Sequence, residues 1–263
     1  MRLLVKLGGT LLDSRESLHR LAGEIAEVSR RHQLVVVHGG GKQMTRFLEK
    51  QGVESQFING LRVSGPEVIE AVLSVFAGTV NHQLVAALRS AGTLPLGLTG
   101  IDAGLTECDV LDPQLGFVGR IVKVRADVLV ALTSSGYLPV VACVGGDSNG
   151  AVYNVNADLM AVALATGFRA EQLWFLTDVE GVRGADGQKL ASLMPSDCIQ
   201  LIASGIATGG MQAKLNAATS AIAGGVQNVV IAPGAQPGIV SRLEQGGEAG
   251  TRLLPEGGVV RHA

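Results

Sequence analysis

Two stretches of the sequence decide the fold: Val5-Lys6-Leu7-Gly8-Gly9-Thr10 and Val37-His38-Gly39-Gly40-Gly41-Lys42. In each, a short apolar run of strand type ends in a cluster of glycines. In an open α/β sheet, ligands bind at the carboxyl ends of the strands, so both loops are expected at a ligand site. Successive glycines let backbone N–H groups converge on an anion, and the next helix N-terminus adds partial positive charge. The loops therefore predict a phosphate or carboxylate site.

A glycine pair alone is explained equally well as an ordinary strand-to-helix turn, but three consecutive glycines and a second similar loop favour a binding site. The loops do not match a P-loop. Gly41-Lys42 has Val36 where that motif needs its first glycine, and Gln43 where it needs Ser or Thr.

Outward from these loops, short β-branched runs alternate with longer runs of helical period, which predicts an α/β fold with a mostly parallel sheet covered by helices. The predicted strands are Leu3–Leu7, Leu34–His38, Pro95–Leu98, Pro139–Ala142, Leu173–Thr177 and Asn228–Ala232. The predicted helices are Ser14–Arg31, Lys42–Gln51, Pro66–Ala91, Ala126–Ser135, Ala157–Ala165, Met211–Gly224 and Gly238–Gln245. A hairpin is predicted between Glu107 and Arg125, around Asp112–Gly116.

The composition indicates one globular domain over residues 1–263, with 47% hydrophobic and 17% charged residues. A net charge of −2 argues against nucleic acid or an anionic membrane as partner. No apolar run approaches the roughly 20 residues that span a bilayer, and the N-terminus lacks the apolar core of a signal peptide. Three widely spaced cysteines predict neither a disulfide framework nor a metal site, and they fit a reducing cytoplasm.

Two lysines stand beside glycines. Lys6 ends the first predicted strand, where burial would usually exclude a charge, and Lys214 falls on the first turn of the helix after Gly209-Gly210. Phosphoryl transfer needs positive charge on the moving group and the leaving diphosphate, which two lysines from different loops would supply. Position alone favours Lys214 as an ordinary solvated lysine on the helix face.

Asn154-Val155-Asn156-Ala157-Asp158 opens a predicted helix. Asn156 suits the N-cap and Asp158 suits the first turn, so a structural account exists for both. The functional account has Asp158 orienting the two lysines and Asn154 binding substrate. Arg62, in a loop before the long helix, could clamp a substrate carboxylate, although surface arginines are common.

Together these residues resemble the acetylglutamate kinases of the amino acid kinase family. The matching segments occur in the family's order and cover nearly the whole chain: Lys6–Gly9, His38–Gly41, Asn59–Val63, Asn154–Asp158, Thr177–Val182 and Gly209–Lys214. The resemblance implies a three-layer αβα sandwich. Its half at about 1–150 would bind an acyl-amino acid and form the dimer contact, and its half at about 151–263 would bind ATP.

The resemblance also implies roles for individual residues. Lys6 and Lys214 would stabilise the transition state of carboxylate phosphorylation, with Asp158 organising them, in a step of arginine biosynthesis. Substrate would bind to Gly40, Gly41, Arg62, Asn154 and Asn156. The nucleotide and its phosphates would bind to Gly8, Gly9, Asp178, Val179, Gly181, Val182, Arg183, Ile206, Ala207, Thr208 and Gly210. Magnesium would bridge the β- and γ-phosphates of ATP, mostly through water, with no protein ligand.

Three departures limit the transfer. Lys42 stands where many relatives carry proline or an apolar residue, and Thr99-Gly100-Ile101-Asp102 replaces a Ser-Gly-Lys-Asp pattern. The chain also starts at its first strand, whereas arginine-inhibited hexameric relatives carry an extra N-terminal helix. The expectation is an arginine-insensitive homodimer that pairs through the helix Pro66–Ala91.

Other functions stay open at this point. The same chemistry could act on N-succinylglutamate or a carrier-linked aminoadipate, because pocket shape sets the acyl group. Aspartokinase is disfavoured, since the chain leaves no room for a separate regulatory domain. A catalytically silent amino-acid or nucleotide sensor would not require both lysines together with Asp158.

Overall fold

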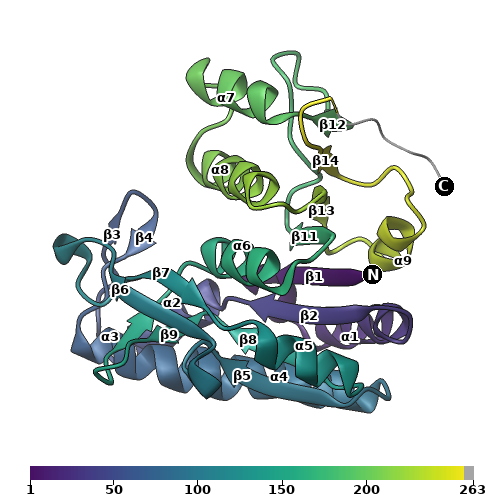
Figure 1. Ribbon diagram of the computed structural model, residues 1–263. Coiled ribbons are helices and arrows are strands. Elements are labelled where there is room, and N and C mark those ends of the chain that lie inside the picture. The colour runs from purple at the N-terminus through teal and green to yellow at the C-terminus, as the bar shows by residue number, and fades with distance from the viewer. Residues whose placement is uncertain (258–263) are drawn as a thin grey trace.

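The computed structural model describes residues 1–257 and has an eight-stranded sheet at its centre (Figure 1). The strand order is β12-β14-β13-β11-β1-β2-β8-β5, and every neighbouring pair is parallel except β13 with β14. The bounds are β1 Arg2–Leu7, β2 Gln33–His38, β5 Pro95–Thr99, β8 Leu138–Ala142, β11 Gln172–Thr177, β12 Ser192–Leu193, β13 Asn228–Pro233 and β14 Thr251–Leu253. The mostly parallel sheet is confirmed.

The middle strands are buried on both faces, which explains their continuous apolar sequences. In β1, Leu3, Leu4, Val5 and Leu7 are fully buried, and the neighbouring stretches of β2 and β11 are equally apolar. The register places Lys6 beside Val37 on one side and Phe175 on the other. Lys6 therefore ends a strand in the middle of the sheet.

Helices cover both faces, so the three-layer αβα sandwich is confirmed. Helices α1, α4 and α9 pack together in one layer, and α5, α6 and α8 pack in another, with α7 against α8. The helix bounds are α1 Arg15–Ser29, α2 Gly41–Lys50, α3 Pro66–Val72, α4 Asn81–Ser90, α5 Asp127–Ser134, α6 Ala157–Phe168, α7 Pro195–Ala203, α8 Gly209–Ala223 and α9 Ile239–Glu244. Short 3-10 helices are η1 Gly9–Leu12, η3 Asp102–Gly104 and η4 Pro113–Leu115.

A second, four-stranded sheet lies beside the first, in the order β10-β9-β6-β7. It contains the predicted hairpin as β6 Thr106–Val110 and β7 Gly119–Val124, paired antiparallel around η4. Its other strands are β9 Val144–Gly146 and β10 Val152–Asn154, and a separate small hairpin joins β3 Phe57–Ile58 to β4 Leu61–Arg62. These short strands were not predicted, because two or three residues show no readable alternation.

All six predicted strands and seven predicted helices are present, with end shifts of a few residues. The strands β12 and β14 and the helix α7 were not predicted. That helix has Pro195 at its first position and Asp197 in its first turn, accepting from the Met194 N–H at 2.7 Å, so a start signal was available.

The predicted helix Pro66–Ala91 is a continuous 25-residue helix, Pro66–Ser90, whose middle is a π-helical segment, η2 Leu73–Val80. An 18-residue stretch of this helix has a mean hydropathy of 1.5, which by length and composition is that of a possible membrane span, and this was not predicted. Half of that apolar stretch is buried inside the protein, as in the core helix of an ordinary globular fold.

Candidate active site

The two glycine loops touch each other at the carboxyl ends of β1 and β2. A methyl group on Gly9 would lie 3.2 Å from the Gly41 nitrogen and 3.3 Å from the Gly40 Cα, closer than ordinary packing allows. A methyl group on Gly40 would in turn lie 2.9 Å from the Phe76 ring. Within residues 1–257, the N–H groups of Gly9, Gly40 and Gly41 donate no hydrogen bond. The contact leaves free donors from both loops in one place, which suits an anion.

Gln43, on the first turn of α2, links the two loops. Its Nε2 donates to the Gly9 carbonyl at 2.9 Å, while its buried Oε1 has no partner. Nearer the surface, Arg46 of the same helix pairs with Asp13 just beyond η1. Helix α2 thus holds the first glycine loop through one partly buried and one exposed contact.

His38 fixes the start of the glycine triplet. Its ring is completely buried; Nδ1 donates to the Gly39 carbonyl at 3.0 Å, and Nε2 accepts from the Asn81 amide at 2.9 Å. Burial lowers the pKa of His38 to about 4, against the opposing effect of the Gly39 hydrogen bond. The imidazole is therefore neutral at pH 7 and serves as a fixed strut between β2 and the long helix.

Lys6, Asp158 and Lys214 converge, although they come from three distant parts of the chain. Lys6 Nζ lies 2.7 Å from Asp158 Oδ1, and Lys214 Nζ lies 3.4 Å from Asp158 Oδ2. Asp158 is 8% exposed and Lys6 is 7% exposed. Burial alone would raise the pKa of Asp158, but the two ammonium groups outweigh it and hold that pKa below its usual range. The group carries a net positive charge beside the glycine loops.

Local structure holds Asp158 in place. It lies in the first turn of α6, where the helix dipole favours a carboxylate, and the Asn156 side chain caps that helix by accepting from the N–H groups of Asp158 (2.9 Å) and Leu159 (3.2 Å). The residue before Asp158, Ala157, lies against Gly39: a methyl group on Gly39 would be 3.2 Å from its Cβ. The loop from β10 to α6 therefore adjoins the glycine triplet.

Arg62 is 9% exposed and lacks an acidic partner in the described chain. Its guanidinium donates to Thr45 Oγ1 at 2.7 Å, to the Gly41 carbonyl at 3.3 Å and to Ser55 Oγ, and it lies over the Phe57 ring at 4.7 Å. Burial lowers its pKa. A largely buried cation that is positioned but not neutralised is suited to bind a carboxylate.

Asn154 ends β10, and its Nδ2 donates to the hydroxyl of Ser64 at 3.0 Å. Ser64 in turn donates to the Arg62 carbonyl at 2.9 Å. Ser64 was not predicted as a site residue, because its contact is with Asn154, 90 residues away, and has no local sequence signal.

Six of the predicted nucleotide residues line one cavity of about 450 Å³: Asp178, Val179, Gly181, Arg183, Ile206 and Ala207. Glu180, Gly184 and Met211 complete its wall. Val182 is not in that wall; it is buried, and its N–H donates to Thr251 Oγ1 at 2.8 Å. Thr208 and Gly210 are also outside the wall, at the start of α8, four to six residues before Lys214.

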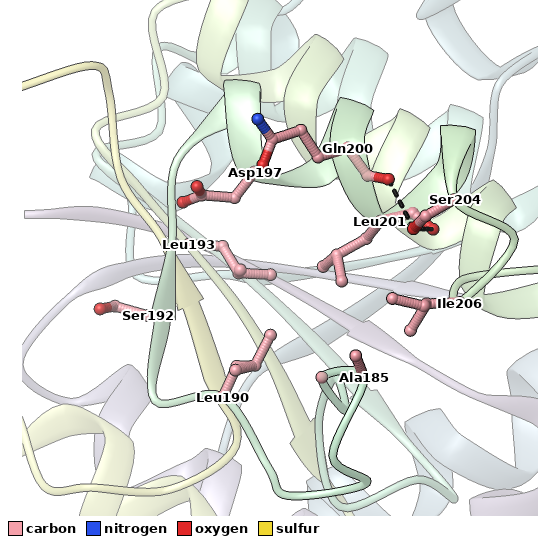
Figure 2. A pocket seen from close by; sticks show the side chains of 10 residues that line it. Ala185, Leu190, Ser192, Leu193, Asp197, Gln200, Leu201, Ser204 and Ile206 are labelled. Carbon is pink, nitrogen blue, oxygen red and sulfur yellow. Dashed lines mark hydrogen bonds between the residues drawn. The ribbon is translucent and has the colours of Figure 1, made fainter.

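A neighbouring cavity of about 520 Å³ shares Gly184 and Ile206 with the first (Figure 2). Leu190, Leu193 and Leu201 give it apolar walls, with Asp197 and Gln200 contributed by α7. The dashed line in Figure 2 is the bond from the Ser204 hydroxyl to the Gln200 carbonyl, 2.8 Å. Nothing in the sequence analysis anticipated this cavity, because α7 was missed.

The arrangement suits transfer of an anionic group between two ligands. Cations and free N–H groups meet where β1, β2, α6 and α8 converge, with Arg62 on one side and the nucleotide-sized cavity in the C-terminal half. Within residues 1–257, there is no group of three or more His, Cys, Asp and Glu side chains that could hold a metal ion.

Comparison with known proteins agrees with this geometry. The model of the amino acid kinase family matches residues 1–233. An acetylglutamate kinase of Solibacter usitatus is 56% identical over 97% of this chain and 99% of its own, and one of Methanopyrus kandleri is 41% identical over 87% and 93%. Among solved structures, N-acetylglutamate synthase of Neisseria gonorrhoeae, complexed with coenzyme A and N-acetyl-glutamate, superposes with a TM-score of 0.85 at 26% identity. This chain aligns over 96% of its length but spans only 59% of that synthase chain.

Proposed function

The chain belongs to the amino acid kinase family, and on that premise we propose that it transfers the γ-phosphoryl group of ATP to the side-chain carboxylate of N-acetyl-L-glutamate. The product is the acyl phosphate, and the step belongs to arginine biosynthesis. The observation that carries the proposal is the convergence of Lys6 and Lys214 on buried Asp158. Beside them, the N–H groups of Gly9, Gly40 and Gly41 are free within residues 1–257.

The chemistry needs charge stabilisation more than proton transfer. The attacking carboxylate is ionised at pH 7, so no base has to remove a proton. Lys6 and Lys214 stabilise the charge that develops on the moving phosphoryl group and the leaving ADP. The Gly9 N–H binds a phosphoryl oxygen, whereas the Gly8 N–H already donates to the Leu176 carbonyl at 2.8 Å and can only hold the loop in place. Asp158 orients the two ammonium groups and is not a general base.

Each half of the chain has its own ligand in this proposal. The half at about 1–150 presents Arg62, Gly40 and Gly41 to the acyl-amino acid, joined by Asn154 from just beyond that boundary. Asn156 takes part mainly by capping α6. The nucleotide occupies the 450 Å³ cavity of the other half, with its base along Ile206. Magnesium would enter with ATP and would supply further positive charge at its phosphates.

We further propose a cytoplasmic homodimer. Leu73 on the long helix and Leu94 and Leu96 around the edge strand β5 are exposed apolar side chains, which would suit a subunit contact. All three cysteines are free and buried, in accord with a reducing compartment. Sedimentation equilibrium tests the dimer; a monomer or a hexamer would contradict it.

The decisive experiment traps the acyl phosphate with hydroxylamine in the presence of ATP and magnesium. N-acetylglutamate, N-succinylglutamate, glutamate and aspartate are compared as acceptors. Hydroxamate formed with N-acetylglutamate alone supports the proposal. Hydroxamate formed only with another acid would keep the reaction but show that the other acid is the substrate. If ATP binds but no acid gives a product, the protein would be a catalytically silent sensor.

A further inference from the structure

Ser64 joins the two sides of the proposed acyl-amino-acid site. It is completely buried, and its hydroxyl makes two hydrogen bonds: it donates to the Arg62 carbonyl at 2.9 Å and accepts from Asn154 Nδ2 at 3.0 Å. Arg62 and Asn154 lie 92 positions apart in the sequence, yet the Ser64 side chain contacts both of them.

Backbone hydrogen bonds tie Ser64 to the neighbouring segment that also binds Asn154. Its N–H donates to the Leu115 carbonyl at 2.9 Å, its carbonyl accepts from the Phe117 N–H at 2.8 Å, and the Phe117 carbonyl accepts from the Asn154 N–H at 2.9 Å. Gly116 lies between these contacts with φ 65°, and a methyl group on it would be 2.6 Å from the Ser64 carbonyl oxygen. These three backbone hydrogen bonds hold the Ser64 hydroxyl opposite the Asn154 amide.

This arrangement determines which way the Asn154 amide faces. A serine hydroxyl has a single hydrogen to donate, and here the Arg62 carbonyl takes it. Toward Asn154 the hydroxyl can therefore only accept, so the amide must present its NH₂ group to Ser64. The oxygen Oδ1 is left without a protein partner in the described chain and is not among the fully buried unpaired atoms, so it is accessible to a ligand.

We propose that Ser64 is a positioning residue that makes Asn154 Oδ1 an acceptor for the N–H group on Cα of the substrate. The inference rests on the proposed function, because N-acetylglutamate carries a secondary amide N–H at that atom. The chemistry selected is a hydrogen-bond donor on Cα: an ester oxygen at the same place would face the amide oxygen and be repelled. An acceptor without its partner is costly, so a site of this kind rejects the analogue that lacks the donor.

The test compares N-acetylglutamate with 2-acetoxyglutarate, which has an ester oxygen in place of the N–H and keeps both carboxylates. ADP release is followed with a coupled assay, because hydroxylamine would attack the ester. In the wild-type protein we expect kcat/KM to favour N-acetylglutamate by about 10- to 100-fold. In Ser64→Ala the freed amide can rotate and offer Nδ2 to the ester, so the ratio should fall at least fivefold. Ser64→Thr keeps the hydroxyl and should keep the ratio.

The ratio distinguishes positioning from mere structural support. If Ser64 only supports the fold, Ser64→Ala lowers kcat/KM for both substrates equally and leaves the ratio unchanged, which overturns the inference. Thermal unfolding midpoints show whether the variant is folded. If it is not, Asn154→Asp serves instead: a carboxylate presents an acceptor whichever way it turns, so preference for the N–H substrate should persist, and its loss overturns the inference. No turnover of N-acetylglutamate by the wild-type protein would refute the proposed function itself.

Discussion

Replacing Asp158 with asparagine removes the one negative charge between Lys6 and Lys214 while keeping the size of the side chain. With an effective dielectric constant of about 20, a charge pair at the observed 2.7 Å is attracted by about 6 kcal/mol and one at 3.4 Å by about 5 kcal/mol. Desolvation of the three groups offsets much of this gross attraction. Breaking a buried ion pair by removing one partner costs about 3–5 kcal/mol, because the remaining charges stay buried.

We therefore expect Asp158→Asn to lower the unfolding free energy by about 3–5 kcal/mol. For a domain of this size, 1 kcal/mol shifts the midpoint by about 2–4 °C, so the fall should be about 6–20 °C. Calorimetry of the ligand-free protein measures it. Asp109→Asn is the matched control: its carboxylate pairs with Arg120 at 2.7 Å, but both side chains are exposed, and no comparable fall is expected.

The same variant, Asp158→Asn, distinguishes an effect on the orientation of the two lysines from an effect on the binding of ATP. Without Asp158 the two lysines repel each other and lose their fixed positions, so kcat should fall, while ATP, a polyanion, should bind at least as tightly as before. An unchanged midpoint together with an unchanged kcat would refute the reasoning, because it would mean that the buried carboxylate neither stabilises the lysines nor orients them.

The pH dependence of this contribution has a definite sign. The pKa of Asp158 is lower in the folded protein than the ordinary value of about 3.9, so its contribution is present above that ordinary value and is lost as the pH falls through the folded pKa. The difference in stability between wild type and Asp158→Asn should be constant from neutral pH to about pH 4 and should shrink only below it. A difference that disappears between pH 5 and 7 would contradict the assignment.

Three further predictions concern activity. Lys6→Ala and Lys214→Ala should each lower kcat by about 10²–10³ in steady-state kinetics, because each ammonium group acts mainly on transition-state charge. An unchanged kcat for Lys6→Ala would exclude this position as the phosphoryl-transfer site. Arg62→Ala should raise KM for the acyl-amino acid with little change in KM for ATP, and Arg62→Lys should not restore it, since a lysine cannot reproduce the planar guanidinium contacts. Gln43→Ala should lower kcat about 5- to 30-fold by releasing the Gly9 carbonyl, whereas Arg46→Ala, which breaks only the exposed tie, should not.

The fold was predictable where local pattern and burial coincide. The strands β1, β2 and β11 are fully buried and read as continuous apolar runs, and the glycine clusters mark their carboxyl ends. Lys6 was recognisable because a charge at the end of such a run is anomalous. For Lys214, position alone did not distinguish a site residue from a solvated one, and only the contact with Asp158, 56 residues away, does so.

Other parts of the site could not be read from the sequence, for different physical reasons. The role of Ser64 depends on its hydrogen bond with Asn154, 90 residues away, and no sequence periodicity links the two residues. In the sequence, Gln43 is an ordinary polar residue of a surface helix. Only the structure shows that its side chain donates to the Gly9 carbonyl. The helix α7, by contrast, was missed despite a proline at its first position, and with it one wall of the larger cavity.

The lysines need not release Asp158 in order to act. Each ammonium group has three N–H donors. In the resting protein Lys214 donates to Asp158 Oδ2 at 3.4 Å, and Lys6 forms an ion pair with Asp158 Oδ1 at 2.7 Å. Up to two donors on each lysine remain for phosphoryl oxygens, in addition to the free N–H groups of Gly9, Gly40 and Gly41. Because Asp158 is itself fixed by the capped first turn of α6, the donors can be aimed before the ligand arrives. Little reorganisation is then required at the moment of transfer, which is the condition under which electrostatic stabilisation lowers a barrier most.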